Sequence, residues 1–143
     1  VYLLSSSTEL KNSYVMFCPD NRSEFQTALK RGYLNHGNCP NGSEAMMKKV
    51  VAVEGDRIDS SLSGVWVNGK KQPFSTPKFT DALNRTLSQW EALNYTLGKN
   101  ELMTMTDQDE WSFDGRYYGL ISIGQIKGVV TPVWVKAKKE REA

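Results

Sequence analysis

The segment VWVNGKK, residues 65–71, constrains the fold of this chain more than any other stretch. An alternating apolar run leads into Asn68-Gly69, and two lysines follow. Asn-Gly is the strongest short-range signal for a β-hairpin, because both central residues of its tight turn need a positive φ. The segment therefore predicts two antiparallel strands joined by a two-residue turn.

Further short apolar runs are separated by Gly, Asn, Pro and Ser, which favour turns. We expect strands at 1–4, 14–18, 47–53, 101–107, 117–123 and 126–137. Residues 81–95 have only weak helical spacing and predict an irregular insertion with about one helical turn. Six or more short strands with such turns indicate a mostly β domain, with antiparallel sheets or a partly open β-barrel.

One short helix is expected in the segment DNRSEFQTALKRGYL, residues 20–34. Ser23 can cap its start, and Gln26 stands three positions later, as in a capping box. Gly32 follows a basic last turn, which is typical of a helix end.

Cys18 and Cys39 flank this helix, and each precedes a proline. They are the only two cysteines, and closing a loop of this size by a disulfide contributes about 3 kcal/mol. We expect the disulfide, which would place the chain in an oxidising compartment, and two free thiols are the alternative.

Composition narrows the function. A chain of 143 residues predicts one domain, 1–143, and its net charge of +2 is too balanced to indicate a nucleic-acid or membrane-surface partner. His36 is the only histidine, so we expect no metal site, and nothing indicates a cofactor. The chain begins at Val1 without a leader, so we expect any membrane anchor to lie upstream.

The segment MMKKVVAVEGDRI, residues 46–58, places two lysines against an apolar run. Side chains of a strand alternate between its faces, so one of Lys48 and Lys49 should point to the apolar side and the other to water. Burial of an amine lowers its pKa and makes it a base near neutral pH. The alternative is a strand that begins at Lys49, with both amines in water.

The segment DEWSFDGRYYGLIS, residues 109–122, carries a second polar pattern. Ser112, Asp114 and Arg116 alternate, so on an extended chain they would share one face, with the carboxylate and the guanidinium close enough to pair. The alternative is an edge strand with a surface ion pair of little energetic value.

Taken together and in this order, these segments resemble the type I signal peptidases. MMKKVVAVEGDRI resembles their lysine box, and SFDGRYYGLIS resembles their last box. KNSYVMF resembles the box between nucleophile and lysine, although Asn12-Ser13 replaces Gly-Asp. The conjugative-transfer peptidases of the TraF type are the most similar branch, through the motifs FCP, GYL, NCP, VNG and IKGVVTPVW. The resemblance covers nearly the whole chain and implies the signal peptidase type of β fold.

This resemblance implies roles for individual residues. Lys48 would be the general base, while Lys49 would face outward. Ser112 would hydrogen-bond to the Lys48 amine and orient it. Asp114 and Arg116 would pair and support the strand that positions Ser112. Gly115 stands where the broader family often has serine, so any contact from that side chain would be missing.

The resemblance places the nucleophilic serine outside the chain. In the conjugative branch that serine lies in a stretch similar to S-x-P-x-G-x-Y, whose last two positions Val1-Tyr2 match. We therefore expect the nucleophile about four residues before Val1, which would leave this chain inert by itself. Ser5, Ser6 and Ser7 are the alternative, but Thr8 stands where the corresponding motif has proline.

The function implied is that of a membrane-associated serine endopeptidase with a Ser-Lys dyad. It would remove the leader from a conjugative pilin precursor and, like some relatives, could join the pilin ends. Its partners would be the prepilin and, through an upstream anchor, the inner membrane, with the domain at the periplasmic face. The alternative is a non-catalytic β domain that binds pilin or other conjugation proteins. A self-cleaving repressor would need a DNA-binding region and an internal cleavage site, and the sequence shows neither.

Overall fold

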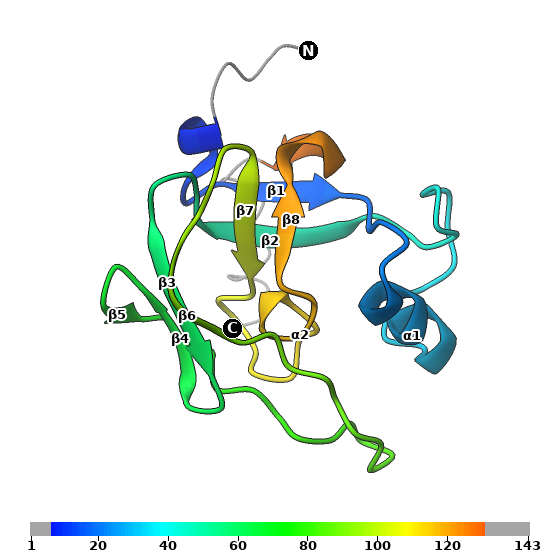
Figure 1. Ribbon diagram of the computed structural model, residues 1–143. Coiled ribbons are helices and arrows are strands. Elements are labelled where there is room, and N and C mark those ends of the chain that lie inside the picture. The colour runs from blue at the N-terminus through cyan, green and yellow to red at the C-terminus, as the bar shows by residue number, and fades with distance from the viewer. Residues whose placement is uncertain (1–6, 131–143) are drawn as a thin grey trace.

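The computed structural model describes residues 7–130. Two antiparallel β-sheets form most of it, with short helices beside them (Figure 1). The five-stranded sheet has the order β8-β7-β2-β1-β9, and the four-stranded sheet has the order β5-β4-β3-β6. In this part of the chain the two sheets do not close into a barrel. The prediction of a mostly β, antiparallel fold is confirmed.

The strands and helices are short. The strands are β1 (Tyr14–Phe17), β2 (Met46–Ala52), β3 (Arg57–Ser61), β4 (Gly64–Val67), β5 (Lys70–Lys71), β6 (Ala92–Thr96), β7 (Glu101–Met105), β8 (Leu120–Ser122) and β9 (Ile126–Val130). The helical segments are η1 (Ser7–Leu10), α1 (Ser23–Arg31), α2 (Gly115–Tyr118) and η2 (Ile123–Gln125). The strand predicted at 1–4 and the part of the last strand beyond residue 130 lie outside the described residues.

The predicted hairpin is confirmed. Asn68 and Gly69 have φ angles of 52° and 84°, and β4 pairs with β5 across them. The Asn68 side chain also accepts a hydrogen bond from the Arg57 backbone N–H, which ties the turn to β3. A local turn signal thus fixed both the place and the register of these strands.

The predicted helix is present as α1, but its predicted cap is wrong. Arg22, not Ser23, is the N-cap residue, and no side chain caps the helix there. The Arg22 guanidinium instead donates to the carbonyls of Tyr118 and Leu120, both at 2.7 Å. Gly32 ends the helix in the left-handed conformation, as predicted.

The Cys18–Cys39 disulfide is present, with 5.5 Å between the Cα atoms. It joins the end of β1 to the chain that leads into β2, so that α1 belongs to a closed excursion from the sheet. This confirms the prediction of a disulfide over that of two free thiols.

Two predictions about local structure are wrong. Residues 112–116 do not form a strand, because the Asp114 side chain accepts a hydrogen bond from the Arg116 N–H and caps α2, which begins at Gly115. The strand predicted at 117–123 is therefore shortened to β8. Within 81–95 no helical turn forms, and β6 was missed: residues 93–96 alternate between apolar and polar side chains, but the run is short and all four residues are exposed. Its strand conformation comes from pairing with β3, which is distant in sequence.

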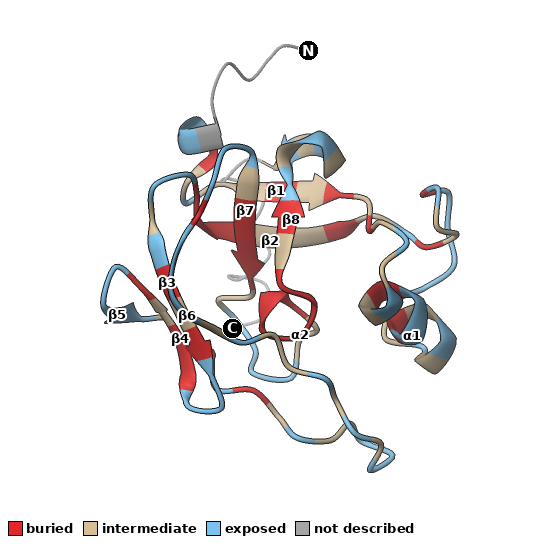
Figure 2. Cartoon of the chain, in the orientation of Figure 1, coloured by how far each residue is buried: buried red, intermediate tan, exposed pale blue. Residues whose placement is uncertain are grey.

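The buried apolar side chains form two clusters. Figure 2 shows where buried residues lie along the strands and helices. The first packs α1 and α2 against the five-stranded sheet and includes Phe17, Phe25 and Tyr118. The second includes Ile58 and Met103 and packs the two sheets together. Strand β2 contributes to both clusters, so its position is fixed from two sides.

Candidate active site

A pocket of about 670 Å³ opens beside the N-terminal half of β2. Four parts of the chain form it: the disulfide-closed excursion, β2 with the residues just before it, the insertion between β5 and β6, and α2 with the loop that leads into it. Its lining residues are Tyr33, Leu34, Asn35, Glu44, Ala45, Met46, Met47, Lys48, Lys78, Thr80, Asp81, Ala82, Leu87, Trp111, Ser112, Phe113 and Tyr117. The pocket thus brings together two predicted site residues, Lys48 and Ser112.

Lys48 lies in the middle of the five-stranded sheet. On β2 it shares a face with Met46 and Val50, both in the first buried cluster, because side chains two positions apart in a strand point the same way. Its partner across the sheet is Val15 on β1. Within the described residues its amine makes no hydrogen bond or ion pair. Burial lowers the pKa of Lys48, the nearby Asp114 carboxylate opposes this, and the Arg116 guanidinium adds to it. The site therefore favours a neutral amine more than water does.

Lys49 has different surroundings. Its amine lies 3.8 Å from the carboxylate of Asp107, to which the Tyr14 hydroxyl also donates a hydrogen bond. Burial and this hydrogen bond raise the pKa of Tyr14 to about 12. Lys49 is absent from the lining of the pocket, so the two neighbouring lysines of β2 have separate environments, as the alternation predicted.

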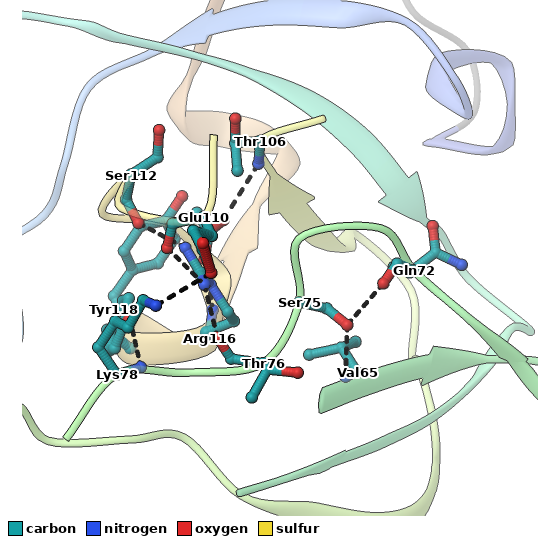
Figure 3. Close-up of polar contacts among 12 residues, drawn as sticks. Val65, Gln72, Ser75, Thr76, Lys78, Thr106, Glu110, Ser112, Arg116 and Tyr118 are labelled. Carbon is teal, nitrogen blue, oxygen red and sulfur yellow. Dashed lines mark hydrogen bonds and ion pairs between the residues drawn. The ribbon is translucent and has the colours of Figure 1, made fainter. Parts of the chain in front are cut away.

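Ser112 reaches the pocket from the loop before α2. Its backbone carbonyl accepts a hydrogen bond of 2.6 Å from the Arg116 guanidinium. Figure 3 shows its hydroxyl directed away from Arg116, and within residues 7–130 that hydroxyl has no hydrogen-bond partner. No hydrogen bond joins it to Lys48 in this part of the chain, so its role in orienting the amine stays a prediction.

Asp114 and Arg116 form a salt bridge of 2.7 Å, and both side chains are 0% exposed. Arg116 also donates to the carbonyls of Thr76, Glu110 and Ser112 (Figure 3). The second carboxylate oxygen of Asp114 accepts the N–H of Thr106. Buried charges are tolerated only when they are fully paired and hydrogen-bonded, and this pair meets that requirement. It supports the loop that carries Ser112, not a strand.

Gly115 lies between the paired residues, where the sequence suggested only a missing serine contact. A Cβ atom at this position would lie 2.6 Å from the Met103 sulfur and 2.7 Å from the Thr104 carbonyl oxygen. Side-chain atoms do not approach backbone so closely, so this packing requires glycine. Gly115 lets α2 lie directly on β7.

The sequence did not point to several residues of the pocket. Tyr33, Phe113 and Tyr117 form an aromatic cluster, with ring centroids 5.6 Å apart for the first two and 6.0 Å for the last two. Lys78 lies over the ring of Trp111 at 4.3 Å. The aromatic richness of WSFDGRYY was the available signal, but nothing local connects it to Tyr33 or to the insertion.

The alternative nucleophiles are not placed. Ser5 and Ser6 lie outside the described residues, and the side chain of Ser7 is not described. No group of three or more His, Cys, Asp or Glu in residues 7–130 could hold a metal ion. In the same residues, neither α1 nor α2 has the length or apolar character that crossing a bilayer demands.

Comparison with known proteins gave consistent results. The family model described as signal peptidase, peptidase S26, matches residues 6–135. Two plasmid transfer proteins TraF from Escherichia coli are 41% and 40% identical over 133 residues, which is 93% of this chain and 75% of each relative. Among solved structures, a signal peptidase I from Enterococcus faecalis V583 is similar with a TM-score of 0.47 and 16% identity, over 85% of this chain and 95% of that one.

Proposed function

The chain belongs to the signal peptidase S26 family, and on that premise we propose that it is the catalytic part of a serine endopeptidase with Lys48 as general base. The observation that carries this proposal is the Lys48 amine, which lines a pocket, has no partner in the described residues and has a lowered pKa. A lysine of this kind can replace histidine in activating a serine.

The proposed reaction is acyl transfer. The serine hydroxyl attacks the scissile carbonyl while its proton passes to the neutral Lys48 amine, and the resulting ammonium protonates the leaving amine. Water, deprotonated by Lys48, then hydrolyses the acyl-enzyme. Backbone N–H donors would stabilise the oxyanion in both steps. Cleavage would follow small side chains.

The loop before α2 would act through Lys48. Ser112 lines the same pocket as Lys48, and its hydroxyl oxygen would accept a hydrogen bond from the amine. The Asp114–Arg116 pair would hold this loop in place through the 2.6 Å bond to the Ser112 carbonyl. These are positioning roles, since none of the three residues would touch the reacting atoms.

We propose that the nucleophile lies upstream of Val1 in the complete protein, with Ser5, Ser6 and Ser7 as the alternatives. An upstream segment would also supply the anchor that holds the domain at the periplasmic face of the inner membrane. The disulfide supports this location, because such bonds persist in oxidising compartments.

The proposed substrate is the precursor of a conjugative pilin. This rests on the relatives at 41% and 40% identity, which are named plasmid transfer proteins. Cyclisation would need a second cleavage, near the carboxyl end of the pilin, so that the serine ester carries the pilin itself. The pilin's own amino end, freed by leader removal, would then attack this ester in place of water, release the serine and close the chain. Leader removal and cyclisation would thus share Lys48 and differ in the bond cleaved and in the acceptor.

The test is processing of the co-expressed prepilin by the full-length protein. We expect Lys48→Ala to abolish cleavage and Lys49→Ala to retain it, because only the first amine lines the pocket. Circular dichroism and thermal unfolding check that both variants fold. Cleavage at the wild-type level by both variants, or no cleavage by the wild type, would favour a non-catalytic β domain that binds conjugation proteins. Mass spectrometry of the product distinguishes a linear from a cyclic pilin.

A further inference from the structure

The insertion between β5 and β6 contains a self-contained loop, residues 79–87. Asp81 organises it: its carboxylate accepts the backbone N–H groups of Leu83 and Arg85 at 2.9 and 2.8 Å. The Arg85 side chain donates to the same carboxylate at 2.7 Å. Leu87 N–H closes the loop on the carbonyl of Phe79 at 2.9 Å. The side chain of Asp81 is only 8% exposed, so the centre of this loop is shielded from water, whereas Leu83 on its outside is 73% exposed.

The loop is attached to the opposite side of the pocket. The Tyr33 hydroxyl, at the end of the α1 segment, donates to Asp81, and Arg31 donates to the Thr86 carbonyl at 2.7 Å. Just before the loop, the Lys78 N–H donates to the Tyr117 hydroxyl at 2.9 Å. Loop 79–87 therefore forms a wall of the pocket that contains Lys48.

This wall offers no unpaired charge to a ligand. Asp81 is paired with Arg85, and Lys78 is paired with Glu110 at 3.0 Å. The pocket lining is mixed: it includes the polar Asn35, Glu44 and Thr80, but it also offers the apolar side chains of Leu34, Met46, Leu87 and Phe113. A volume of about 670 Å³ exceeds what an alanine-like side chain occupies and lies in the range of sites that hold larger groups.

We propose that loop 79–87 is a specificity wall that receives a large apolar side chain of the peptide substrate, with Leu87 and Ala82 setting the size of the space. This rests on the proposed function and adds to it a second recognition position, separate from the small residue at the cleavage point. Leu83 projects from the same loop, is 73% exposed and does not line the pocket, so it serves as a matched control.

The test measures binding, so that it does not depend on catalysis. The probes are peptides that span the processing site of the co-expressed prepilin, each with one position changed in turn to Ala, Leu or Phe. Titration calorimetry follows their binding to full-length Lys48→Ala protein. At one position we expect Leu or Phe to bind better than Ala, and Leu87→Ala to shift the Phe-to-Leu preference about tenfold toward Phe. Leu83→Ala should leave every preference unchanged.

Tyr33→Phe provides a second test that keeps the ring and removes only the hydroxyl bonded to Asp81. We expect it to weaken binding of the peptides with the large apolar residue and to leave the others unaffected. Unchanged preferences in both Leu87→Ala and Tyr33→Phe would overturn the specificity wall. Failure of the enzyme proposal would show separately, as absence of cleavage by the protein with Lys48 intact.

Discussion

Two loops border the pocket, and each is built around an aspartate–arginine pair. In loop 109–116 the pair is Asp114–Arg116, and in loop 79–87 it is Asp81–Arg85. Both aspartates accept backbone N–H groups that follow them in the chain. The pairs differ in their surroundings: Asp114 and Arg116 are 0% exposed, whereas the Arg85 side chain is 37% exposed.

This difference in burial separates two uses of one local motif. Arg116 bonds to carbonyls from the insertion and from its own loop, so its removal would leave several buried groups unpaired. Within residues 7–130, the Arg85 side chain bonds only inside loop 79–87, where water can replace it. The first pair therefore belongs to the fold and fixes Ser112, while the second shapes a wall that can differ between substrates.

The largest change in the free energy of unfolding is expected when the buried Asp114–Arg116 pair is broken. Arg116→Met should destabilise the domain by about 3–5 kcal/mol, because the Asp114 charge would stay buried without its partner. Arg85→Met should cost less than about 1 kcal/mol, as for other partly exposed pairs. Urea unfolding followed by circular dichroism compares the two. Similar losses in both variants would show that burial does not distinguish the loops.

A smaller effect should follow from adding one methyl group to the loop that carries the buried pair. Gly115→Ala would place a Cβ against the Met103 sulfur and the Thr104 carbonyl, and such overpacking costs about 1–3 kcal/mol. Gly128, on β9, has open space where a Cβ would go. The matched Gly128→Ala change should therefore stay within about 0.5 kcal/mol of wild type.

Unfolding in urea again measures both glycine variants. A stable Gly115→Ala protein would mean that α2 can move away from β7. Such a movement would weaken the view that loop 109–116 is the rigid side of the pocket.

The sequence predicted those parts of the fold whose signals are local. Asn68-Gly69 predicted the hairpin because a two-residue turn needs two positive φ angles. Gly32 marked the end of α1, where it has a φ of 85°. Strand β6 has only a weak signal, since the alternation of apolar and polar residues over 93–96 is short. Its side chains are largely exposed, so its conformation depends on pairing with β3.

The candidate site, like the fold, was predictable only where its signals are local in the sequence. The pairing of Asp114 with Arg116 followed from their spacing, but the extended conformation did not, because the Asp114 side chain caps a helix instead. The hydrogen bond from Tyr33 to Asp81 joins residues 48 positions apart, and neither segment carries a sign of the other. Local patterns singled out the lysine pair and Ser112, and the resemblance chose Lys48 and assigned a role to each. Only the structure places the loop 79–87 wall beside them.

The smallest effect concerns the electrostatic influence of the two loops on Lys48. The charges that act on its pKa come from loop 109–116: Asp114 and Asp109 raise it, and Arg116 lowers it, while burial lowers it most. Asp109→Asn removes an attraction to the ammonium and should therefore lower the Lys48 pKa further. Asp81→Asn should leave that pKa unchanged. NMR titration of the lysine Cε resonances measures both.

Activity provides a second measure of the same contrast. A general base must be neutral, so the acidic limb of the pH–rate profile follows the Lys48 pKa. Asp109→Asn should move this limb to lower pH, because the amine loses its proton more readily, and Asp81→Asn should not move it. A shift with Asp81→Asn as large as that with Asp109→Asn would mean that both loops act on the base. Loop 79–87 would then influence the chemistry as well as recognition, and the division between a catalytic side and a specificity side of the pocket would be wrong.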